Sequence, residues 1–444
     1  MDKLIDQVRG LSKEDMTNYN ANLMVGGGTP GPCIVSGKGV RLFDNEGKSY
    51  IDCTSQSWAM YLGFGNAEIR ETVYENMEGM SHIHQGFHTK QRFSLANRLA
   101  SIAPKNLNRV SFTVGGGPAI EAAMKIALKN VPGAQTFCCL WDAYHGSGLT
   151  AAGASWTVTK AAGHYTGQRN FIPDMNTNFV RLPNPYCYRC PFKKDVASCD
   201  CECADFSKLM IQKGVIGPLA GILIEPIQAS GGQIPAPKKY LQRMRQIADE
   251  FGALLIFDEI QTYLRIGDWY AANHYDVEPD IIVLGKGLGA GMPIAAIIIH
   301  DRLKGFEMAA EELHTFANNS VSQIAALKQI EIVERDGILA NARNMGQRMA
   351  DKLNGLKKQY PQIGDVRQVG LHVGVEMIDP KTGQPMETEL AAKVRATAME
   401  NGLILGTGGF NKALLKFKPA LIVNAEEIDE IVGIFGVTLQ KVLG

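Results

Sequence analysis

Short apolar segments alternate with amphipathic segments between residues 109 and 325. The apolar segments have the length and composition of strands that are buried on both faces. The segments between them, such as 119–130 and 238–252, repeat apolar residues at helical spacing. This alternation predicts a doubly wound, mostly parallel sheet of the α/β class, whose ligand binds beyond the carboxyl ends of the strands. The expected strands are 109–114, 136–141, 220–227, 253–260, 280–286 and 294–300.

The two ends of the chain show a different pattern. Residues 1–25 have the pattern of a polar amphipathic helix, and residues 66–104 and 326–360 are helical in pattern. Short alternating runs near the N-terminus predict a small antiparallel sheet, and strands around a helix are expected near the C-terminus. We therefore expect a large domain over 61–325 and a smaller α+β domain built from residues 1–60 and 326–444. The expected terminal strands are 33–37, 40–44, 49–53, 365–379 and 414–423, and the expected C-terminal helices are 389–402 and 426–443.

The amino-acid composition and the net charge argue against two classes of protein, nucleic-acid-binding and membrane-spanning. The chain has 444 residues with 45 basic and 45 acidic side chains, so its net charge is zero. A dedicated nucleic-acid-binding protein normally carries a basic excess, so this balance argues against one. No apolar run is long enough to span a membrane, and the N-terminus lacks the apolar core of a signal peptide. These features predict a cytoplasmic enzyme.

Three segments carry candidate chemistry. The strand at 253–260 ends in Asp258 and Glu259, and a buried acid at a strand end usually faces a site or a partner. Lys286 follows the strand at 280–286 and stands between glycines, where burial favours a reactive amine. Gly116 and Gly117 precede a clear helix, whose free N–H groups favour a phosphate. Taken singly, Lys286 is better explained as a solvated lysine in a loop, and the glycine-rich segment is about equally well explained as a plain tight turn.

Together, the three segments match the requirements of pyridoxal 5'-phosphate. A helix start anchors the phosphate, and an acid keeps the pyridine nitrogen protonated so that the ring withdraws electrons. The lysine holds the cofactor as a Schiff base and moves the proton on the substrate carbon. The combination therefore predicts a pyridoxal-phosphate enzyme.

The chain also resembles the class III (ω-type) aminotransferases, which are fold-type I pyridoxal-phosphate enzymes. The resemblance extends from about residue 30 to the C-terminus, and its motifs occur in the family's order. The spacing of the Asp-Glu-x-Gln and Gly-Lys-Gly-Leu-Gly motifs is especially specific. The matching segments are 42–52, 112–125, Tyr144-His145-Gly146, 225–232, 254–262, 283–293, 315–319 and 416–421.

The resemblance implies a role for each matching residue. Lys286 is expected to bind the cofactor covalently, Asp258 to pair with its pyridine nitrogen, and Gln261 to lie near its ring hydroxyl. Tyr144 is expected to stack on the ring, and Glu225 to lie near the ring and the substrate. The backbone of Gly116 and Gly117 would bind the phosphate. Thr315 matches a threonine that reaches the phosphate of the neighbouring subunit, which implies a homodimer, or a dimer of such dimers, with shared active sites.

Several positions depart from the family pattern. The usual Asn-Ser-Gly-Thr run is replaced at 114–120 by a glycine-rich sequence that lacks its polar side chains, so phosphate binding would depend on backbone N–H groups. The segments 263–267 and 317–320 also differ. Many members carry an arginine that binds the substrate carboxylate, whereas this chain has Lys416. Lysine is a point charge without the planar fork of arginine, so the usual amino-acid and 2-oxoglutarate pair is placed in doubt.

Two further features have open interpretations. Trp58 falls where related enzymes line the substrate pocket, but a buried core tryptophan fits equally well. Five of the nine cysteines lie between Cys187 and Cys203, in a spacing unlike a secreted disulfide framework. Four thiolates are enough for a zinc site. A loop insertion with free thiols is the simpler interpretation, so no metal is expected.

The predicted activity is transfer of an amino group from an amine or amino acid to a 2-oxo acid. The same scaffold also supports amino-acid racemases or epimerases and ammonia- or phospho-lyases, and the loss of the arginine at 416 slightly favours these alternatives. A non-catalytic binding protein is a third possibility. The joint presence of Asp258, Gln261 and Lys286 argues against it.

Overall fold

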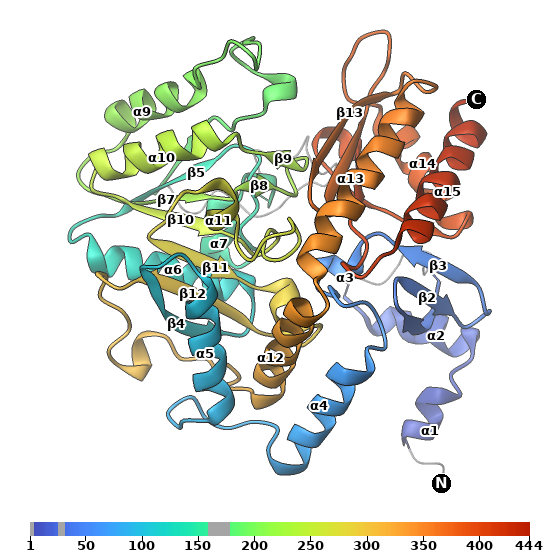
Figure 1. Ribbon diagram of the computed structural model, residues 1–444, viewed down its shortest axis with the longest axis horizontal. Helices are drawn as coiled ribbons and strands as arrows, with labels where there is room; N and C mark the ends of the chain where they lie inside the picture. The colour runs from blue at the N-terminus through green and yellow to red at the C-terminus, as the bar shows by residue number, and fades with distance from the viewer. Residues whose placement is uncertain (1–3, 25–31, 159–177) are drawn as a thin grey trace.

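A seven-stranded sheet forms the centre of the protein (Figure 1). The computed structural model describes residues 4–24, 32–158 and 178–444. Only β12 runs antiparallel to its neighbours within this sheet, so the predicted mostly parallel sheet is confirmed. In spatial order its strands are β4 (Leu107–Thr113), β12 (Ala295–His300), β11 (Ile281–Leu284), β10 (Leu254–Asp258), β7 (Leu219–Ile224), β5 (Thr136–Leu140) and β6 (Phe179–Leu182).

Helices bury both faces of this sheet. In β10, Ile256 contributes to the apolar cluster that contains the residues of α6, whereas Leu255 and Phe257 contribute to the cluster that contains α10. Successive side chains of a strand point to opposite faces, which is why a continuous apolar run suits a sheet that is covered twice. The helices associated with this region are α4 (Ala67–Gly79), α5 (Lys90–Ile102), α6 (Gly116–Asn130), α7 (Leu149–Ala154), α9 (Glu202–Gly214), α10 (Lys238–Glu250) and α11 (Ala271–Tyr275).

Two smaller four-stranded sheets are built from the ends of the chain. The N-terminal strands pair antiparallel as expected, and β15 from the C-terminal region joins them in parallel to β3. The expected strand at 365–379 is a hairpin, and the strand expected over 414–423 ends at Phe417, just before Lys418 and Pro419. The strands are β1 (Ile34–Lys38), β2 (Arg41–Asp44), β3 (Ser49–Asp52), β13 (Ile363–Val369), β14 (His372–Met377), β15 (Leu403–Ile404), β16 (Gly406–Gly408) and β17 (Leu414–Phe417), with the short pair β8 (Ile227–Gln228) and β9 (Ile234–Pro235) elsewhere.

The helical region expected at 326–360 is two helices, α12 (Ser320–Arg335) and α13 (Ile338–Lys357), separated by Gly337 with φ of 63°. A positive φ of this size ends a helix. Helix α12 crosses the expected domain boundary at residue 325, and the domain limits stay a prediction. Helices α14 (Thr388–Glu400) and α15 (Ala425–Leu443) complete the C-terminal region.

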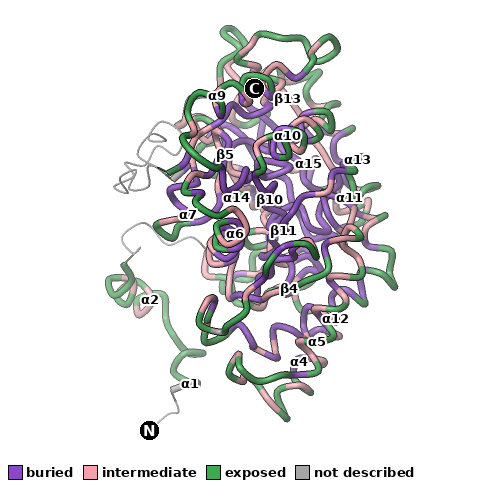
Figure 2. The backbone as a smooth tube through the Cα atoms, turned by 90° about the vertical axis from the view of Figure 1, so that its left-hand side faces the viewer, coloured by how far each residue is buried: buried purple, intermediate pink, exposed green. Residues whose placement is uncertain are grey.

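The single helix predicted over residues 1–25 is wrong. The segment forms two short helices, α1 (Leu4–Arg9) and α2 (Lys13–Tyr19). Ser12 begins the second one, because its side chain accepts a hydrogen bond from Asp15 N while the Asp15 carboxylate accepts one from Ser12 N. Both helices are exposed and lie apart from the buried interior (Figure 2). None of the helices in the described ranges has both the length and the apolarity to cross a bilayer.

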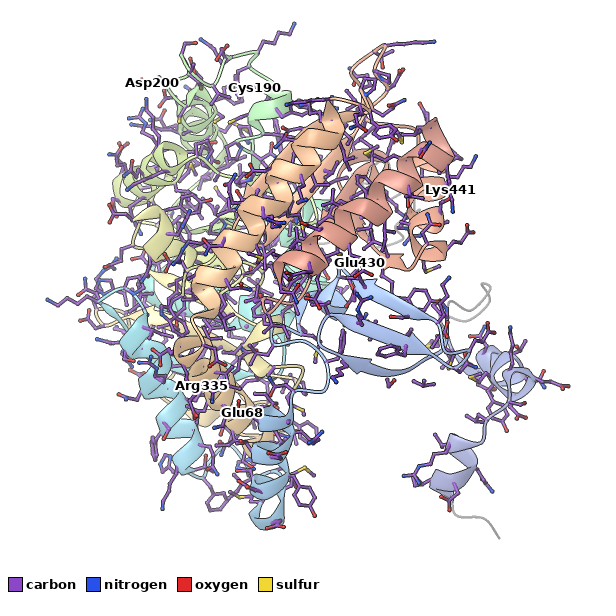
Figure 3. All side chains as sticks on the ribbon, turned by 45° about the vertical axis from the view of Figure 1, so that its right-hand side comes forward. Glu68, Cys190, Asp200, Arg335, Glu430 and Lys441 are labelled. Atoms are coloured by element: carbon purple, nitrogen blue, oxygen red, sulfur yellow. The ribbon has the colours of Figure 1, made fainter. Side chains whose placement is uncertain are left out.

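Ion pairs connect segments that are distant in the sequence (Figure 3). Arg335 of α12 donates to both carboxylate oxygens of Glu68 in α4, at 2.7 and 2.8 Å. Arg41 of β2 pairs with Glu430 of α15. Because solvent screens these side chains, the pairs contribute little to the stability of the protein. The buried sheets, rather than these pairs, provide most of the stability.

Glu259 is completely buried and holds the start of α11. Its carboxylate accepts hydrogen bonds from the backbone N–H groups of Ala271 and Ala272, the second at 2.9 Å, and from Thr262 Oγ1 at 3.1 Å. Burial raises the pKa of this carboxyl from 4.5 to about 7, although the hydrogen bonds oppose the shift. Glu259 therefore ties the end of β10 to the start of α11.

The pH dependence of stability tests this position. The folded pKa of Glu259 is raised above 4.5, so its favourable contribution is complete below that pH and decreases as pH rises to about 7. The full change corresponds to about 3 kcal/mol. Glu259→Gln cannot ionise at this position, so the variant does not lose stability as pH rises. The Tm difference, variant minus wild type, should therefore increase between about pH 5 and pH 7 and stay constant above that range. A Tm difference that is independent of pH would contradict this assignment.

Gly346 allows α13 to approach the β13–β14 turn closely. A Cβ atom at Gly346 would lie 1.8 Å from the carbonyl oxygen of Gly370. We expect Gly346→Ala to reduce the unfolding free energy by about 1–3 kcal/mol, measured by thermal or denaturant unfolding. Gly355→Ala is the control because it lies in the same helix with nothing within 4 Å of its added Cβ. The control should be neutral or stabilising by up to about 1 kcal/mol. Equal effects of both substitutions would contradict the close contact.

Candidate active site

A cavity of about 320 Å³ opens at the carboxyl ends of the central strands. This is where ligands bind in parallel α/β sheets. Seven of the ten residues expected at the site line it, and the other three, Trp58, Thr315 and Lys416, do not. The lining residues are Gly116, Gly117, Pro118, Glu121, Tyr144, His145, Gly146, Ser147, Gly148, Glu225, Asp258, Ile260, Gln261 and Lys286.

Asp258 ends β10 and is held by two hydrogen bonds. Its Oδ1 accepts from Ile260 N at 3.1 Å, and its Oδ2 lies 2.8 Å from His145 Nδ1. Both side chains are buried, and no partner of His145 Nε2 is present in the described part of the chain. His145 thus fixes the orientation of the Asp258 carboxylate. The sequence gives no position-specific signal for this role, because the two residues are 113 positions apart.

Lys286 follows β11 and directs its amine toward the same cavity. Its φ of 45° lies in the left-handed region, and the next residue, Gly287, approaches Tyr61 so closely that a Cβ would lie 2.0 Å from the ring. Burial lowers the pKa of the Lys286 ammonium, while the carboxylates of Asp258 and Glu225 oppose this shift. A larger fraction of the amine is therefore neutral and nucleophilic than for an exposed lysine.

The start of α6 provides backbone donors to the cavity. Helix α6 begins at Gly116, so Gly116 and Gly117 belong to its first turn instead of preceding the helix as expected. The first-turn N–H groups have no acceptor within the helix, and the helix dipole favours an anion there. Gly116 allows this turn to lie against Ile260, because a Cβ would come within 2.8 Å of Ile260 Cδ1. This geometry fits a phosphate group.

Glu225 holds the loop that carries Tyr144. Its two carboxylate oxygens accept hydrogen bonds from Tyr144 N at 2.9 Å and from Ala229 N at 3.1 Å. Burial raises the pKa of the Glu225 carboxyl, and the nearby His145 opposes this shift. Glu225 therefore orders the cavity wall at Tyr144.

Three lysines surround Trp58 beside the cavity. The Nζ atoms of Lys416, Lys418 and Lys286 lie 4.7, 4.8 and 5.9 Å from the centroid of its ring. Lys416 is 2% exposed, and burial lowers its pKa to about 7, with Glu225 opposing and Lys286 adding to the shift. Sequence reasoning did not identify Lys418, whose place here follows only from the end of β17.

Trp58 is held by an unusual turn. Residues 55–58, labelled α3 (Ser55–Trp58), all have positive φ between 42° and 67°. Asp52 stabilises this turn by accepting hydrogen bonds from Thr54 N at 2.7 Å and Gln56 N at 3.1 Å. Left-handed backbone costs roughly 1–2 kcal/mol per residue, so the surrounding contacts must hold the indole in place.

Thr315 and the cysteine cluster lie outside this arrangement. Thr315 is exposed and does not line the cavity of its own chain. Residues 187–203 form a loop and the start of α9, where Cys199 Sγ contacts Glu202 at 3.0 Å; Figure 3 shows Cys190 and Asp200 in this peripheral region. Within the described ranges, no three His, Cys, Asp or Glu side chains are arranged to hold a metal ion.

The cavity residues fit pyridoxal phosphate. The α6 start supplies donors for a phosphate, Asp258 supplies a carboxylate for a ring nitrogen, and Lys286 supplies an amine for the aldehyde carbon. All three groups line one cavity, which is the arrangement that the sequence predicted.

Known proteins share this architecture. A sequence model of the class III aminotransferases matches residues 26–439. The chain is 33% identical over 427 residues to a probable aminotransferase of Mycobacterium tuberculosis, covering 91% of this chain and 89% of that protein. It is 32% identical over 400 residues to a leucine/methionine racemase of Thermococcus litoralis, covering 89% and 88%. A crystal structure of a Bacillus anthracis aminotransferase, 24% identical, has the same fold with a TM-score of 0.86 and coverage of 99% and 100%. The chain therefore belongs to the class III aminotransferases, a family of pyridoxal-phosphate enzymes with the fold-type I architecture.

Proposed function

We propose that this enzyme transfers an amino group from an amine or amino acid to a 2-oxo acid, with Lys286 as the residue that binds the cofactor covalently. The observation that carries the proposal is the convergence of Lys286, Asp258 and the glycine start of α6 on one cavity. Each comes from the carboxyl end of a different strand or from the turn that follows one. A solvated lysine in a loop would not bring these three groups together.

Each cavity residue would have a separate role in binding the cofactor or in catalysis. Gly116 and Gly117 bind the phosphate through their backbone, and Tyr144 lies against the ring. Asp258, oriented by His145 at 2.8 Å, holds a proton on the pyridine nitrogen. When bound, the cofactor supplies an electron-withdrawing ring that stabilises negative charge on the substrate carbon. Lys286 Nζ, freed when the substrate amine takes its place on the cofactor, would accept the proton from that substrate carbon and release it again as the amino group moves.

Lys416 and Trp58 are proposed to contact the substrate. Lys416 has no hydrogen-bonding or ion-pair partner among the described residues, and it lies 4.7 Å from the Trp58 ring centre. An acid group on the substrate would pair with the ammonium form of Lys416. Since the pKa of Lys416 is lowered to about 7, this attraction is strongest below neutral pH and weakens as pH rises.

Racemisation is the second candidate activity. The similarity to a leucine/methionine racemase supports it, as does the presence of a second buried amine, Lys416, near Lys286. A racemase returns the proton to the opposite face of the substrate carbon and needs no amino acceptor. Product analysis therefore separates the two activities.

We also propose that the enzyme is a homodimer. Five exposed apolar side chains gather near Thr315, and a patch of this kind is typical of a protein interface. The 85–93 segment is tied to this region by hydrogen bonds from Gln85 to Glu312 and from Asn318 to Phe87. The patch consists of Phe87, Phe93, Met308, Leu313 and Phe316. A location in the cytoplasm stays a prediction.

Lys286→Ala tests the central proposal. In wild type, borohydride should fix the cofactor to a peptide containing Lys286, detectable by mass spectrometry, and an amine donor should convert the cofactor to its aminated form. Both results should disappear in Lys286→Ala, because Lys286 is the only lysine among the described residues that line the cavity.

The same assay also detects racemisation, the second candidate activity. Loss of the enantiomeric excess of a chiral amino acid, without amination of the cofactor or formation of an oxo acid, would contradict transamination and support racemisation. A borohydride adduct on Lys286 together with racemisation would retain the lysine assignment and change only the activity.

Thr315→Ala tests the shared site. If Thr315 of one subunit binds the phosphate in the other, its loss should weaken cofactor affinity about tenfold to a hundredfold, because one charge-assisted hydrogen bond is removed. The measurement is the cofactor Kd by absorbance titration, with dimer mass checked by light scattering. Thr382→Ala is a matched control because Thr382 is exposed in a turn outside the cavity. An active monomer, or equal Kd values for both variants, would contradict the proposal.

A further inference from the structure

Lys418 is a buried lysine with neutral partners beside the active site. Its side chain is 0% exposed, and its Nζ lies 3.0 Å from Gln261 Oε1 and 2.9 Å from His372 Nε2. No carboxylate pairs with it among the described residues. A buried ammonium without a carboxylate is costly, so its retention next to the cavity suggests a function.

The contact with Lys418 determines how Gln261 presents its amide. An amine nitrogen donates hydrogen bonds, so the oxygen of Gln261 must face Lys418. The amide Nε2 of Gln261 then points elsewhere, and no partner for it is present among the described residues. Because Gln261 lines the cavity with Asp258 and Lys286, it offers an N–H donor to a bound molecule.

His372 supports this arrangement from the opposite side. When Lys418 is an ammonium, His372 Nε2 accepts its hydrogen bond and the imidazole proton lies on Nδ1. Burial lowers the pKa of His372, and the charges of Lys418, Arg265 and Lys416 lower it further. His372 is therefore a neutral acceptor that holds Lys418 without repelling it.

We propose that Lys418 is a positioning residue that directs the Gln261 amide N–H toward the ring hydroxyl of the cofactor and places a positive charge behind it. This proposal rests on the proposed pyridoxal-phosphate site. The hydroxyl is adjacent to the reactive carbon, and its anionic form gains from both a donor and a nearby cation. Lys418 thereby favours the cofactor's anionic oxygen without touching the substrate.

The charges around Lys418 make its protonation depend on the cofactor. Burial lowers the pKa of Lys418, and Lys416, Arg265 and Lys286 lower it further, whereas Glu225 is the acid that opposes the shift. An anionic ring oxygen beyond Gln261 adds a second opposing charge. The cofactor and the Lys418 ammonium therefore stabilise each other.

Lys418→Met tests the proposal through the absorbance of the cofactor-loaded enzyme. We expect the pH midpoint of the visible absorbance transition to rise by about one unit, because the anionic oxygen loses a donor and a charge. Lys416→Met is the matched control. It removes a lysine at nearly the same distance from Trp58, 4.7 against 4.8 Å, but leaves the Gln261 hydrogen bond intact. Equal midpoint shifts in the two variants would overturn the proposal.

A double-mutant comparison identifies the route of the effect. If Lys418 acts in part through Gln261, then Lys418→Met combined with Gln261→Ala should shift the midpoint by less than the sum of the two single shifts, because only the effect of the charge remains once the amide is gone. Fully additive shifts would overturn the proposal. Gln261→Glu is the alternative test if Lys418→Met does not fold. This substitution keeps an acceptor for Lys418 but removes the N–H donor that Gln261 offers to the cavity. Its midpoint should also rise, and an unchanged midpoint would contradict the proposal.

The absorbance measurement separates this inference from the proposed activity. A wild-type enzyme that forms no coloured complex with pyridoxal phosphate would contradict the proposed cofactor site itself. A coloured enzyme whose midpoint is unaffected by Lys418→Met would contradict only the role of Lys418.

Discussion

A cluster of buried basic side chains at the junction between the central sheet and the C-terminal strands is the constraint on which the site depends. Arg265, Lys416 and Lys418 are buried there, and Lys286 lies beside them. Arg265 is held by the carbonyl oxygens of Leu371 and Pro419, at 3.2 and 2.8 Å, and by Ser55 Oγ. Buried cations require such acceptors or a bound anion. A phosphate-bearing cofactor would offset part of this excess.

This constraint also explains the geometry around Trp58. The left-handed turn at Ser55–Trp58 is strained, but Asp52 accepts its N–H groups and Arg265 binds Ser55. The turn places the indole face against Lys416 and Lys418, where a ring stabilises a cation without a counter-charge. Strain at one turn thus provides Lys416 with a partner that it otherwise lacks among the described residues.

The two adjacent acids at the end of β10 show how similar residues acquire different functions. Asp258 faces the cavity and is oriented by His145, whereas Glu259 turns to the start of α11. Alternation along a strand separates the two side chains, so one serves the site and the other the fold. The family assignment defines the cofactor chemistry.

The sequence alone determined the sheet-forming segments and the order of the motifs, and it placed Asp258, Lys286 and the glycines of the α6 start at strand ends, because apolar periodicity and strand ends are local features. It missed the break between α1 and α2, where a capping interaction at Ser12 overrides the amphipathic pattern. Only the tertiary structure decided the pairing of His145 with Asp258 and of Lys418 with Gln261, 113 and 157 positions apart. It also left Trp58, Thr315 and Lys416 outside the cavity lining. These outcomes depend on which distant segments meet, and a pattern read along one segment contains no information about the neighbours that folding brings to it.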